Sequence, residues 1–162
     1  ARFGSGIQFV LPMAYTLSPE WIEGIAVSSG VPIRLVAGRT HEVLSAADAA
    51  IVASGTATLE TALLVKPMVI VYKVSPLTFF LGKRVVRVKH IGLANIVAGR
   101  TVVPELIQQD FTAERVADEV TRILVDQNVR DTMIRELSEI RARLGNPGAA
   151  RRAARLACDM LG

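Results

Sequence analysis

Aromatic side chains are scarce in this chain of 162 residues, at 5%, and nowhere do they alternate with basic residues. Proteins that bind single-stranded nucleic acids stack the bases on aromatic side chains that line a basic groove. The sequence therefore predicts no nucleic-acid partner. The net charge of +4 comes mainly from arginines in the C-terminal third, which fit either solvated helix faces or contact with an anionic membrane surface or an anionic substrate.

Cysteine and histidine are scarce as well. The single cysteine, Cys158, cannot form an internal disulfide; it fits a reducing compartment, and we expect it to be a small core residue. His41 and His90 have no carboxylate or cysteine at the spacing of metal ligands, so each is predicted to be a surface or packing residue. We expect no metal site and no cofactor.

Long apolar runs are absent, because Gly, Pro or a charged residue interrupts each of them. A membrane-spanning helix needs about 20 apolar residues, so none is predicted. With 51% hydrophobic and 21% charged residues, the composition is that of a globular protein. The start, ARFGSGIQFV, has neither an initiator methionine nor a signal-peptide pattern, and we expect the chain to be part of a longer protein.

Apolar runs and helix signals alternate from residue 7 to about residue 93. Uninterrupted apolar strands are typical of a parallel sheet that is covered on both faces and binds ligands at the carboxyl ends of its strands. The predicted fold class is α/β, a Rossmann-like parallel sheet flanked by helices with a C-terminal helical tail. Strands are predicted at 7–11, ended by Pro12, and at 33–36, 49–53, 68–71 and 91–93.

Helix signals surround these strands. The first helix is expected to start at Pro19, to stop before Gly30, and to carry Trp21, Ile22 and Ile25 inward. Residues 1–111 form the predicted Rossmann-like domain, and 112–162 form a tail that packs on this domain or on a partner. The predicted N-caps are Ser18, Thr40, Ser75, Thr112 and Asn128, and the later helices are expected at 40–47, from Ala57, and at 76–86, 104–109, 112–126, 128–144 and 149–161.

Residues 49–71, AAIVASGTATLETALLVKPMVIV, form the central unit: a buried strand, a turn at Ser54, Gly55 and Thr56, a helix and a second buried strand. Where a parallel strand leads into a helix, backbone N–H groups and the positive end of the helix dipole favour a phosphate. Glu60 follows Thr56 by four residues on the same helix face, where its carboxylate suits a ribose diol. The alternative is that Thr56 is a helix N-cap and Glu60 an acid that complements the dipole.

A second polar cluster follows residue 93 in a glycine-interrupted loop: Asn95, Gly99, Arg100, Glu105 and Gln108. An amide, a guanidinium and an acid together suit hydrogen bonds to a sugar and charge contact with a phosphate. The alternative is an ordinary polar loop. Because the sequence contains no Gly-x-Gly-x-x-Gly fingerprint, Walker lysine loop or Gly-x-Ser-x-Gly elbow, the two clusters carry the functional prediction.

Two long blocks give a more specific signal: ADAAIVASGTATLETALLVKPMVIVYKVSPLTFFLGKRVV and, after it, IGLANIVAGRTVVPELIQ. Over about residues 46–109 they resemble the C-terminal half of the lipid-A-disaccharide synthase family, with FVLP at 9–12 as a weaker extension. The resemblance implies one half of a GT-B glycosyltransferase. That family transfers 2,3-diacylglucosamine from its UDP donor to 2,3-diacylglucosamine 1-phosphate, with inversion and release of UDP, in lipid A biosynthesis. It works without a metal in the site, as a peripheral protein on the cytoplasmic face of the inner membrane.

By the same resemblance, this chain is the donor-binding part. Glu60 is expected to bind the ribose hydroxyls of UDP. Asn95 falls on the asparagine of the family's Asn-x-x-Ala-Gly-Arg block, which is expected at the donor sugar or pyrophosphate, where it would position the donor for catalysis. The diphosphate is assigned to Ser54, Gly55 and Thr56, and the further candidates in the second block are Arg100, Glu105 and Gln108.

The chain also departs from the family pattern. The family's general base is an aspartate of the N-terminal domain, so the resemblance implies that this chain is inactive by itself. The chain is expected to begin after the first strand and helix of its domain, without a Gly-Ser-Arg loop near the phosphates. One side of the sheet would then be exposed, which favours a homodimer. Ala94 stands where the family has proline. Two alternatives stay open: a noncatalytic UDP-sugar-binding or assembly module, and another UDP-N-acetylglucosamine-using GT-B enzyme.

Overall fold

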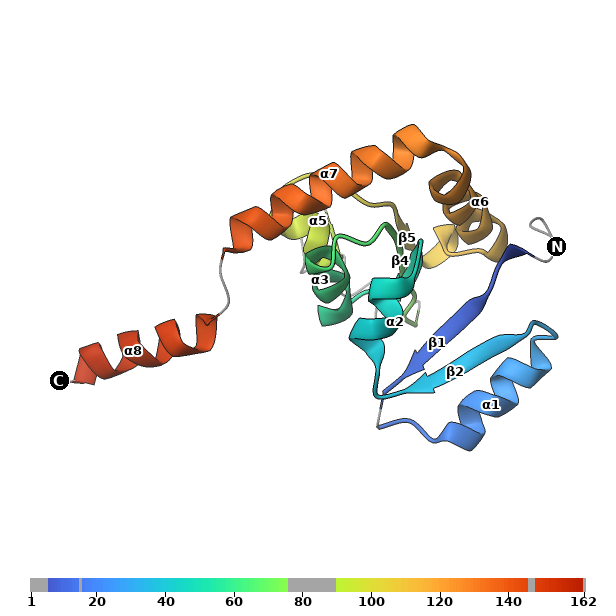
Figure 1. Cartoon of the computed structure of the whole chain (residues 1–162), viewed down its shortest axis with the longest axis horizontal. Helices are drawn as coiled ribbons and strands as arrows, with labels where there is room; N and C mark the ends of the chain where they lie inside the picture. Colours follow the sequence, from blue (N-terminus) through green and yellow to red (C-terminus); the bar gives the residue numbers. More distant parts are fainter. Residues whose placement is uncertain (1–5, 15, 76–89, 146–147, 162) are drawn as a thin grey trace.

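Parallel strands in two sheets form the centre of the computed structural model, which describes residues 6–14, 16–75, 90–145 and 148–161 (Figure 1). In the first sheet β1 (Phe9–Met13) pairs with β2 (Ile33–Ala37). In the second, β4 (Met68–Tyr72) lies between β3 (Ala50–Ala53) and β5 (Glu105–Ile107). With helices on these sheets, the α/β Rossmann-like class is confirmed.

The first strand extends beyond its predicted end at Pro12. Pro12 pairs with Val36 inside β1, and the strand runs to Met13. The carbonyl of Met13 accepts a hydrogen bond from the N–H of Gly38, at 3.4 Å, so Met13 faces β2. Because alternate residues of a parallel strand bond to opposite sides, Pro12 faces the unpaired edge, where its missing N–H breaks no pairing.

Two further predictions after residue 90 are wrong. Residues 91–93 form no strand, because α5 (Leu93–Ala98) begins there. Residues 104–109 form no α-helix but β5 and a short 3₁₀ helix, η2 (Gln108–Asp110). The N–H of Ile70 donates to the carbonyl of Pro104 at 2.9 Å, so pairing with the central strand, a long-range contact, decides the conformation of this segment.

The helices mostly follow their predicted ranges, while their caps differ in part. Ser18 and Thr112 cap their helices as predicted. The helix predicted at 128–144 is capped by Asp126 and not by Asn128. Thr40 is the first residue of its helix rather than the cap. The remaining helices are α1 (Pro19–Ser28), α2 (Thr40–Ala46), α3 (Thr56–Leu63), α6 (Ala113–Val125), α7 (Gln127–Leu144) and α8 (Ala149–Leu161), and the predicted helix at 76–86 lies outside the described residues.

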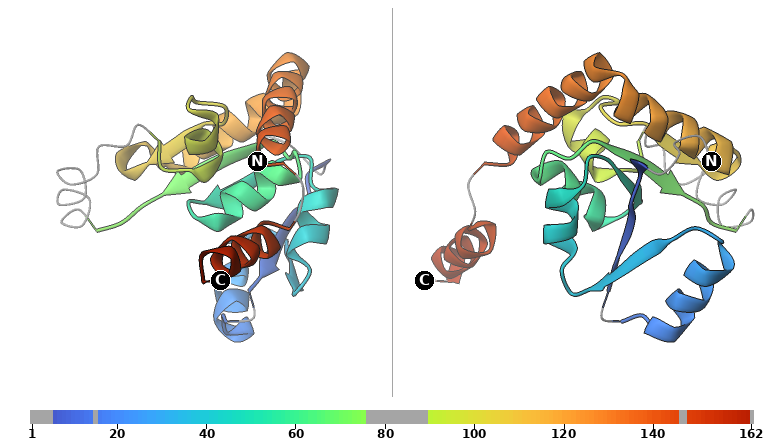
Figure 2. Two further views of the ribbon diagram at one scale, coloured as in Figure 1. Left: turned by 90° about the vertical axis from the view of Figure 1, so that its left-hand side faces the viewer. Right: turned by 45° about the vertical axis from the view of Figure 1, so that its right-hand side comes forward.

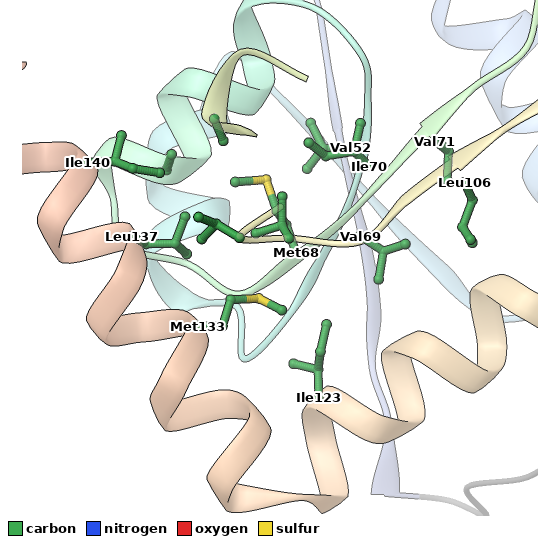
Figure 3. Packing of buried hydrophobic residues seen from close by; sticks show 14 residues of the cluster. Val52, Met68, Val69, Ile70, Val71, Leu106, Ile123, Met133, Leu137 and Ile140 are labelled. Atoms are coloured by element: carbon green, nitrogen blue, oxygen red, sulfur yellow. The ribbon is translucent and has the colours of Figure 1, made fainter. Parts of the chain in front are cut away.

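The core lies around β4, whose residues Met68, Val69 and Ile70 are at most 1% exposed. Figure 3 shows Ile123 of α6 and Leu137 of α7 pointing toward these side chains. Both helices therefore complete the core of the second sheet. By contrast, α8 projects away from the rest of the chain in Figure 1 and in the right-hand view of Figure 2.

Two expectations about burial are wrong. Cys158 is exposed, because α8 is exposed along its described length. In α1 the buried residues are Ile22 and Ala26, whereas Trp21 and Ile25 are 59% and 50% exposed. Since α1 covers a sheet of only two strands, only one of its apolar stripes finds a surface to pack on.

The described residues contain no group of three or more His, Cys, Asp or Glu side chains that is arranged to hold a metal ion. Among the described helices, none is both long and apolar enough to cross a membrane.

Candidate functional site

The turn between β3 and α3 lies at the carboxyl end of a parallel strand. Gly55 has φ +153°, a backbone conformation that residues with a Cβ avoid, so glycine is required there. Gly55 occupies the N-cap position of α3, and no side chain caps this helix. The interpretation of Thr56 as an N-cap is therefore wrong. Thr56 is the exposed first residue of the helix. The N–H of Thr58 donates to the carbonyl of Gly55 at 3.1 Å, so the open N–H groups at the start of α3 are those of Thr56 and Ala57.

Glu60 lies one helical turn beyond Thr56 on the same face of α3. Its side chain is half-buried, and no donor among the described residues reaches its carboxylate. The turn thus combines open N–H groups, the positive end of a helix dipole and, one turn later, a carboxylate acceptor. That order of groups matches a diphosphate followed by a sugar diol.

The segment before α5 lies against this turn. The hydroxyl of Ser54 donates to the carbonyl of Ile91 at 3.2 Å, and the N–H of Leu93 donates to the hydroxyl of Thr58 at 3.1 Å. The Thr58 hydroxyl itself donates to the carbonyl of Gly55 at 2.7 Å. The two polar clusters of the sequence therefore meet through residues 91–93, which border the start of α3.

Glu105, the first residue of β5, holds this segment from the other side. Its carboxylate accepts from the N–H groups of Ile91 and Gly92, at 3.0 and 3.1 Å, and from the amide of Asn95 at 2.8 Å. A Cβ on Gly92 would lie 2.2 Å from the Cδ1 of Ile70, so only glycine allows the segment to pack this closely on β4. The position of residues 91–93 is thus fixed by a carboxylate and by a glycine.

Asn95 is fully buried and uses its whole side-chain amide inside the chain. Its NH₂ group donates to the carbonyl of Val103 and to Glu105, both at 2.8 Å. Its Oδ1 accepts from the N–H groups of Val102 and Val103, at 2.8 and 3.0 Å. An asparagine side chain has two donor hydrogens and two acceptor lone pairs. Each of them is occupied, so Asn95 joins α5 to β5 and offers a ligand no free atom.

Gln108 has a similar bridging role at the ends of the neighbouring strands. Its side chain accepts from the N–H of Val74 at 2.7 Å and donates to the carbonyl of the same residue at 3.0 Å. Val74 follows β4 and Gln108 follows β5, so this pair fixes the carboxyl ends of two adjacent strands.

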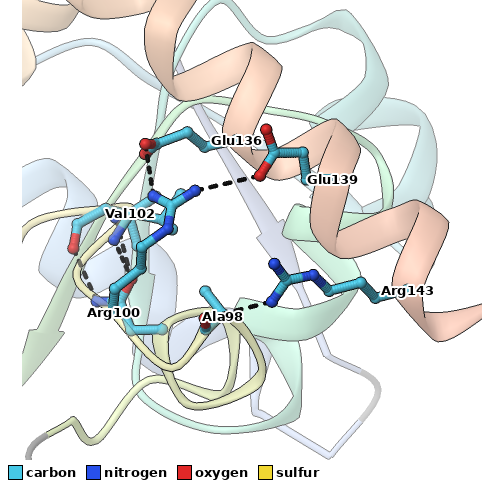
Figure 4. A network of polar contacts seen from close by, with 8 residues as sticks. Ala98, Arg100, Val102, Glu136, Glu139 and Arg143 are labelled. Carbon is cyan, nitrogen blue, oxygen red and sulfur yellow. Dashed lines mark hydrogen bonds and ion pairs between the residues drawn. The ribbon is translucent and has the colours of Figure 1, made fainter.

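Arg100 lies at the far end of α5 from Leu93. Its guanidinium forms ion pairs with Glu136 and Glu139 of α7, as Figure 4 shows. Arg143 of α7 also donates to the carbonyl of Ala98, at 3.4 Å. The structure therefore ties Arg100 to α7 and does not bring it to the β3–α3 turn.

Two residues of this site are missing from the sequence prediction, Thr58 and Gly92. Thr58 is fully buried and links the turn to Leu93. A threonine two residues after the turn and a glycine directly before a helix are the signals that would have indicated them. Both signals are common in proteins, because they also occur wherever a helix simply needs close packing.

A family model described as Lipid-A-disaccharide synthetase matches residues 5–157. The chain belongs to this family. Relatives named lipid-A-disaccharide synthase are 49% identical over 156 residues in Syntrophus aciditrophicus, 48% over 160 residues in Trichlorobacter lovleyi and 46% over 156 residues in Myxococcus xanthus. Each alignment covers 96% of this chain and 41% of the relative. The lipid-A-disaccharide synthase resemblance is thereby confirmed, and the chain spans about two fifths of these relatives.

Proposed function

We propose that this chain is the donor-binding part of a lipid-A-disaccharide synthase. The complete enzyme would transfer 2,3-diacylglucosamine from its UDP donor to 2,3-diacylglucosamine 1-phosphate and release UDP. The observation that carries the donor-binding role is the uncapped start of α3 at the carboxyl end of β3, with Glu60 one turn further along. Membership in the family supports the choice of a UDP-sugar as the ligand.

The proposed contacts follow from the chemistry of the donor. The diphosphate lies at the first amides of α3, next to Ser54, Gly55 and the Thr56 hydroxyl, and the ribose hydroxyls donate to Glu60. When the glycosidic bond breaks, negative charge develops on the departing UDP, and oriented N–H groups stabilise that charge. The general base for the acceptor hydroxyl comes from the rest of the protein.

Asn95, Glu105 and Gln108 act on the donor indirectly in this proposal. Asn95 and Glu105 hold residues 91–93 beside the turn, so they position the backbone that faces the donor sugar. Gln108 fixes the ends of β4 and β5. Arg100 contributes by keeping α5 on α7, which leaves its charge away from the phosphates.

We also propose that the protein is cytoplasmic and binds the anionic surface of the inner membrane through α8. This helix is exposed along its described length, with Leu156 and Met160 at 65% and 87% exposure. Arg151, Arg152 and Arg155 stand beside these apolar side chains. Such a helix favours the surface of a membrane with negative headgroups. A homodimer that covers the same apolar face is the competing arrangement.

A thermal-shift titration tests donor binding. UDP at a hundredfold excess over its Kd is expected to stabilise the folded chain by about 2.7 kcal/mol, with a smaller effect of UMP and none of AMP at the same concentrations. Glu60→Ala is expected to weaken the binding of UDP at least about tenfold, because one or two hydrogen bonds to a charged group are lost. Thr121→Ala, on α6 away from the turn, serves as the control that keeps UDP affinity. A folded chain that shows no shift with UDP contradicts the proposal.

A further inference from the structure

Two threonines of α3, Thr58 and Thr61, are fully buried. The Thr61 hydroxyl donates to the carbonyl of Ala57 at 2.7 Å, a bond that is common for a threonine inside a helix and by itself indicates no function. The Thr58 hydroxyl makes the same kind of bond to the carbonyl of Gly55, also at 2.7 Å. In addition it accepts from the N–H of Leu93, 35 residues further along the chain, at 3.1 Å. Thr58 therefore joins two elements, whereas the Thr61 bond lies within α3.

The carbonyl of Gly55 accepts two hydrogen bonds from Thr58, one from its N–H at 3.1 Å and one from its hydroxyl at 2.7 Å. This carbonyl and the N–H of Thr56 belong to one planar trans peptide unit, in which the two groups point in opposite directions. A carbonyl held toward Thr58 thus directs the N–H of Thr56 out of the helix. That N–H has no acceptor among the described residues. Thr58 therefore sets the direction of the first open N–H of α3.

Gly55 itself does little to fix this direction. A residue without a Cβ leaves the peptide units on either side of it more freedom to rotate. The residue before it is held at two points: the N–H of Ser54 donates to the carbonyl of Val71 at 2.9 Å, and its hydroxyl donates to the carbonyl of Ile91 at 3.2 Å. On the other side of the glycine, the two bonds from Thr58 hold the peptide unit in place.

The donor to the Thr58 oxygen, Leu93, is the first residue of α5, and the N-cap residue Gly92 has no side chain that could cap this helix. The first N–H groups of a helix have no intrahelical acceptor and need a partner from elsewhere. For Leu93 the Thr58 hydroxyl is that partner, while the carboxylate of Glu105 accepts from the N–H groups of Ile91 and Gly92. The start of α5 is thus fixed to α3 through Thr58 and to β5 through Glu105.

We propose that Thr58 is a positioning residue for the diphosphate of the donor. This role rests on the proposed function, because it needs the donor phosphates at the start of α3. A chain of groups runs from the N–H of Leu93 through the Thr58 hydroxyl and the peptide unit between Gly55 and Thr56 to a phosphate oxygen. Hydrogen bonds in such a chain polarise one another, so a phosphate bound at Thr56 strengthens the bonds behind it. One buried hydroxyl thereby couples the phosphate contact of α3 to the start of α5.

Isothermal titration calorimetry with UDP and with uridine, which lacks the phosphates, tests this role. Thr58→Val keeps the shape of the side chain without its hydroxyl and is expected to weaken UDP at least about tenfold and uridine less than about twofold. Thr58→Ser keeps the hydroxyl, so it is expected to bind UDP within about threefold of the wild type. Thr61→Val is the matched control, an equally buried change on the same helix that is expected to reduce stability and to keep the UDP affinity within about twofold.

Failure of the positioning role and failure of the proposed function give different results. A Thr58→Val variant that binds UDP as tightly as the wild type, or that loses uridine affinity as much as UDP affinity, overturns the positioning role alone. An equal loss of UDP affinity in Thr61→Val also overturns it, because the cause is then a general loosening of α3. Absence of UDP binding by the wild-type chain overturns the proposed function and the positioning role with it.

A measurement on the unmodified chain stands even if Thr58→Val does not fold. In nuclear magnetic resonance spectra of the isotope-labelled chain, the amide signals of Thr56 and Leu93 are expected to shift together when UDP is added. Uridine is expected to shift them much less, because only a phosphate polarises the whole chain of hydrogen bonds. A Leu93 signal that stays in place while UDP binds overturns the coupling.

Discussion

Asn95 makes four hydrogen bonds from a fully buried position, and each of its partners belongs to α5, β5 or the link between them. A side chain with this surrounding stabilises the fold even if no ligand is bound. Under the proposed function, Asn95 would act on a donor only through residues 91–93. We therefore expect Asn95 to affect both stability and donor affinity, and Glu60 to affect donor affinity with little effect on folding.

Replacement of Asn95 by alanine tests this hydrogen-bond network. We expect it to lower the free energy of unfolding by about 3 kcal/mol or more, because it leaves the N–H groups of Val102 and Val103 without a partner in the interior and removes one of the three donors to the Glu105 carboxylate. Urea denaturation followed by circular dichroism measures this loss. Gln109→Ala, at an exposed neighbouring site, is expected to change it by less than about 0.5 kcal/mol. A similar result for both variants contradicts the assigned network.

Gly92 and Gly24 lie in different surroundings, so we expect their replacement by alanine to have opposite effects on stability. Gly92→Ala places a methyl group against Ile70 and is expected to cost about 1–3 kcal/mol of stability. Gly24→Ala, within α1 and with open space around its Cα, is expected to add about 0.5–1 kcal/mol. Thermal unfolding of both variants measures the difference, and a neutral Gly92→Ala would show that the 91–93 segment packs more loosely on β4.

At the scale of the element, the start of α7 depends on one aspartate. Asp126 accepts from the N–H groups of Asn128 and Val129, at 3.0 and 3.2 Å. Asp126→Ala is therefore expected to cost about 1 kcal/mol, and Asn128→Ala to be nearly neutral. Chemical denaturation of the two variants checks this order. The reverse order would restore the capping role that the sequence assigns to Asn128.

The sequence predicts elements well where the signal is local. The strands predicted at 33–36 and 68–71 and the cap predicted at Thr112 are confirmed. Each of these signals lies within a few consecutive residues, so it can be recognised without knowledge of tertiary contacts. The three residues of β5 are strand only because they pair with β4, which no local pattern reveals. The same holds for the cluster around residue 95, which the sequence predicts from its polar residue types alone. Whether such a residue meets a ligand or the backbone is decided by tertiary contacts.

At the scale of the whole molecule, α8 is the element with the least support from the rest of the chain. If it binds an anionic membrane, the variant with Arg151, Arg152 and Arg155 changed to Gln is expected to bind phosphatidylglycerol vesicles at least about tenfold more weakly, since each arginine contributes about 1 kcal/mol near such a surface. Vesicle co-sedimentation measures this, and added salt should weaken the wild-type binding. Equal binding to neutral vesicles, or dimers held together by α8, contradicts the membrane role.

The uncapped start of α3 has a consequence for the proposed exchange of donor and product. No side chain of the described chain caps this helix, so under the proposed function a diphosphate would supply the acceptors that a serine or aspartate supplies elsewhere. The first turn is nevertheless already formed, because the N–H and the hydroxyl of the buried Thr58 both donate to the carbonyl of Gly55, at 3.1 and 2.7 Å. Donor and UDP would therefore meet a preorganised turn, and little of the binding free energy would be spent on ordering it.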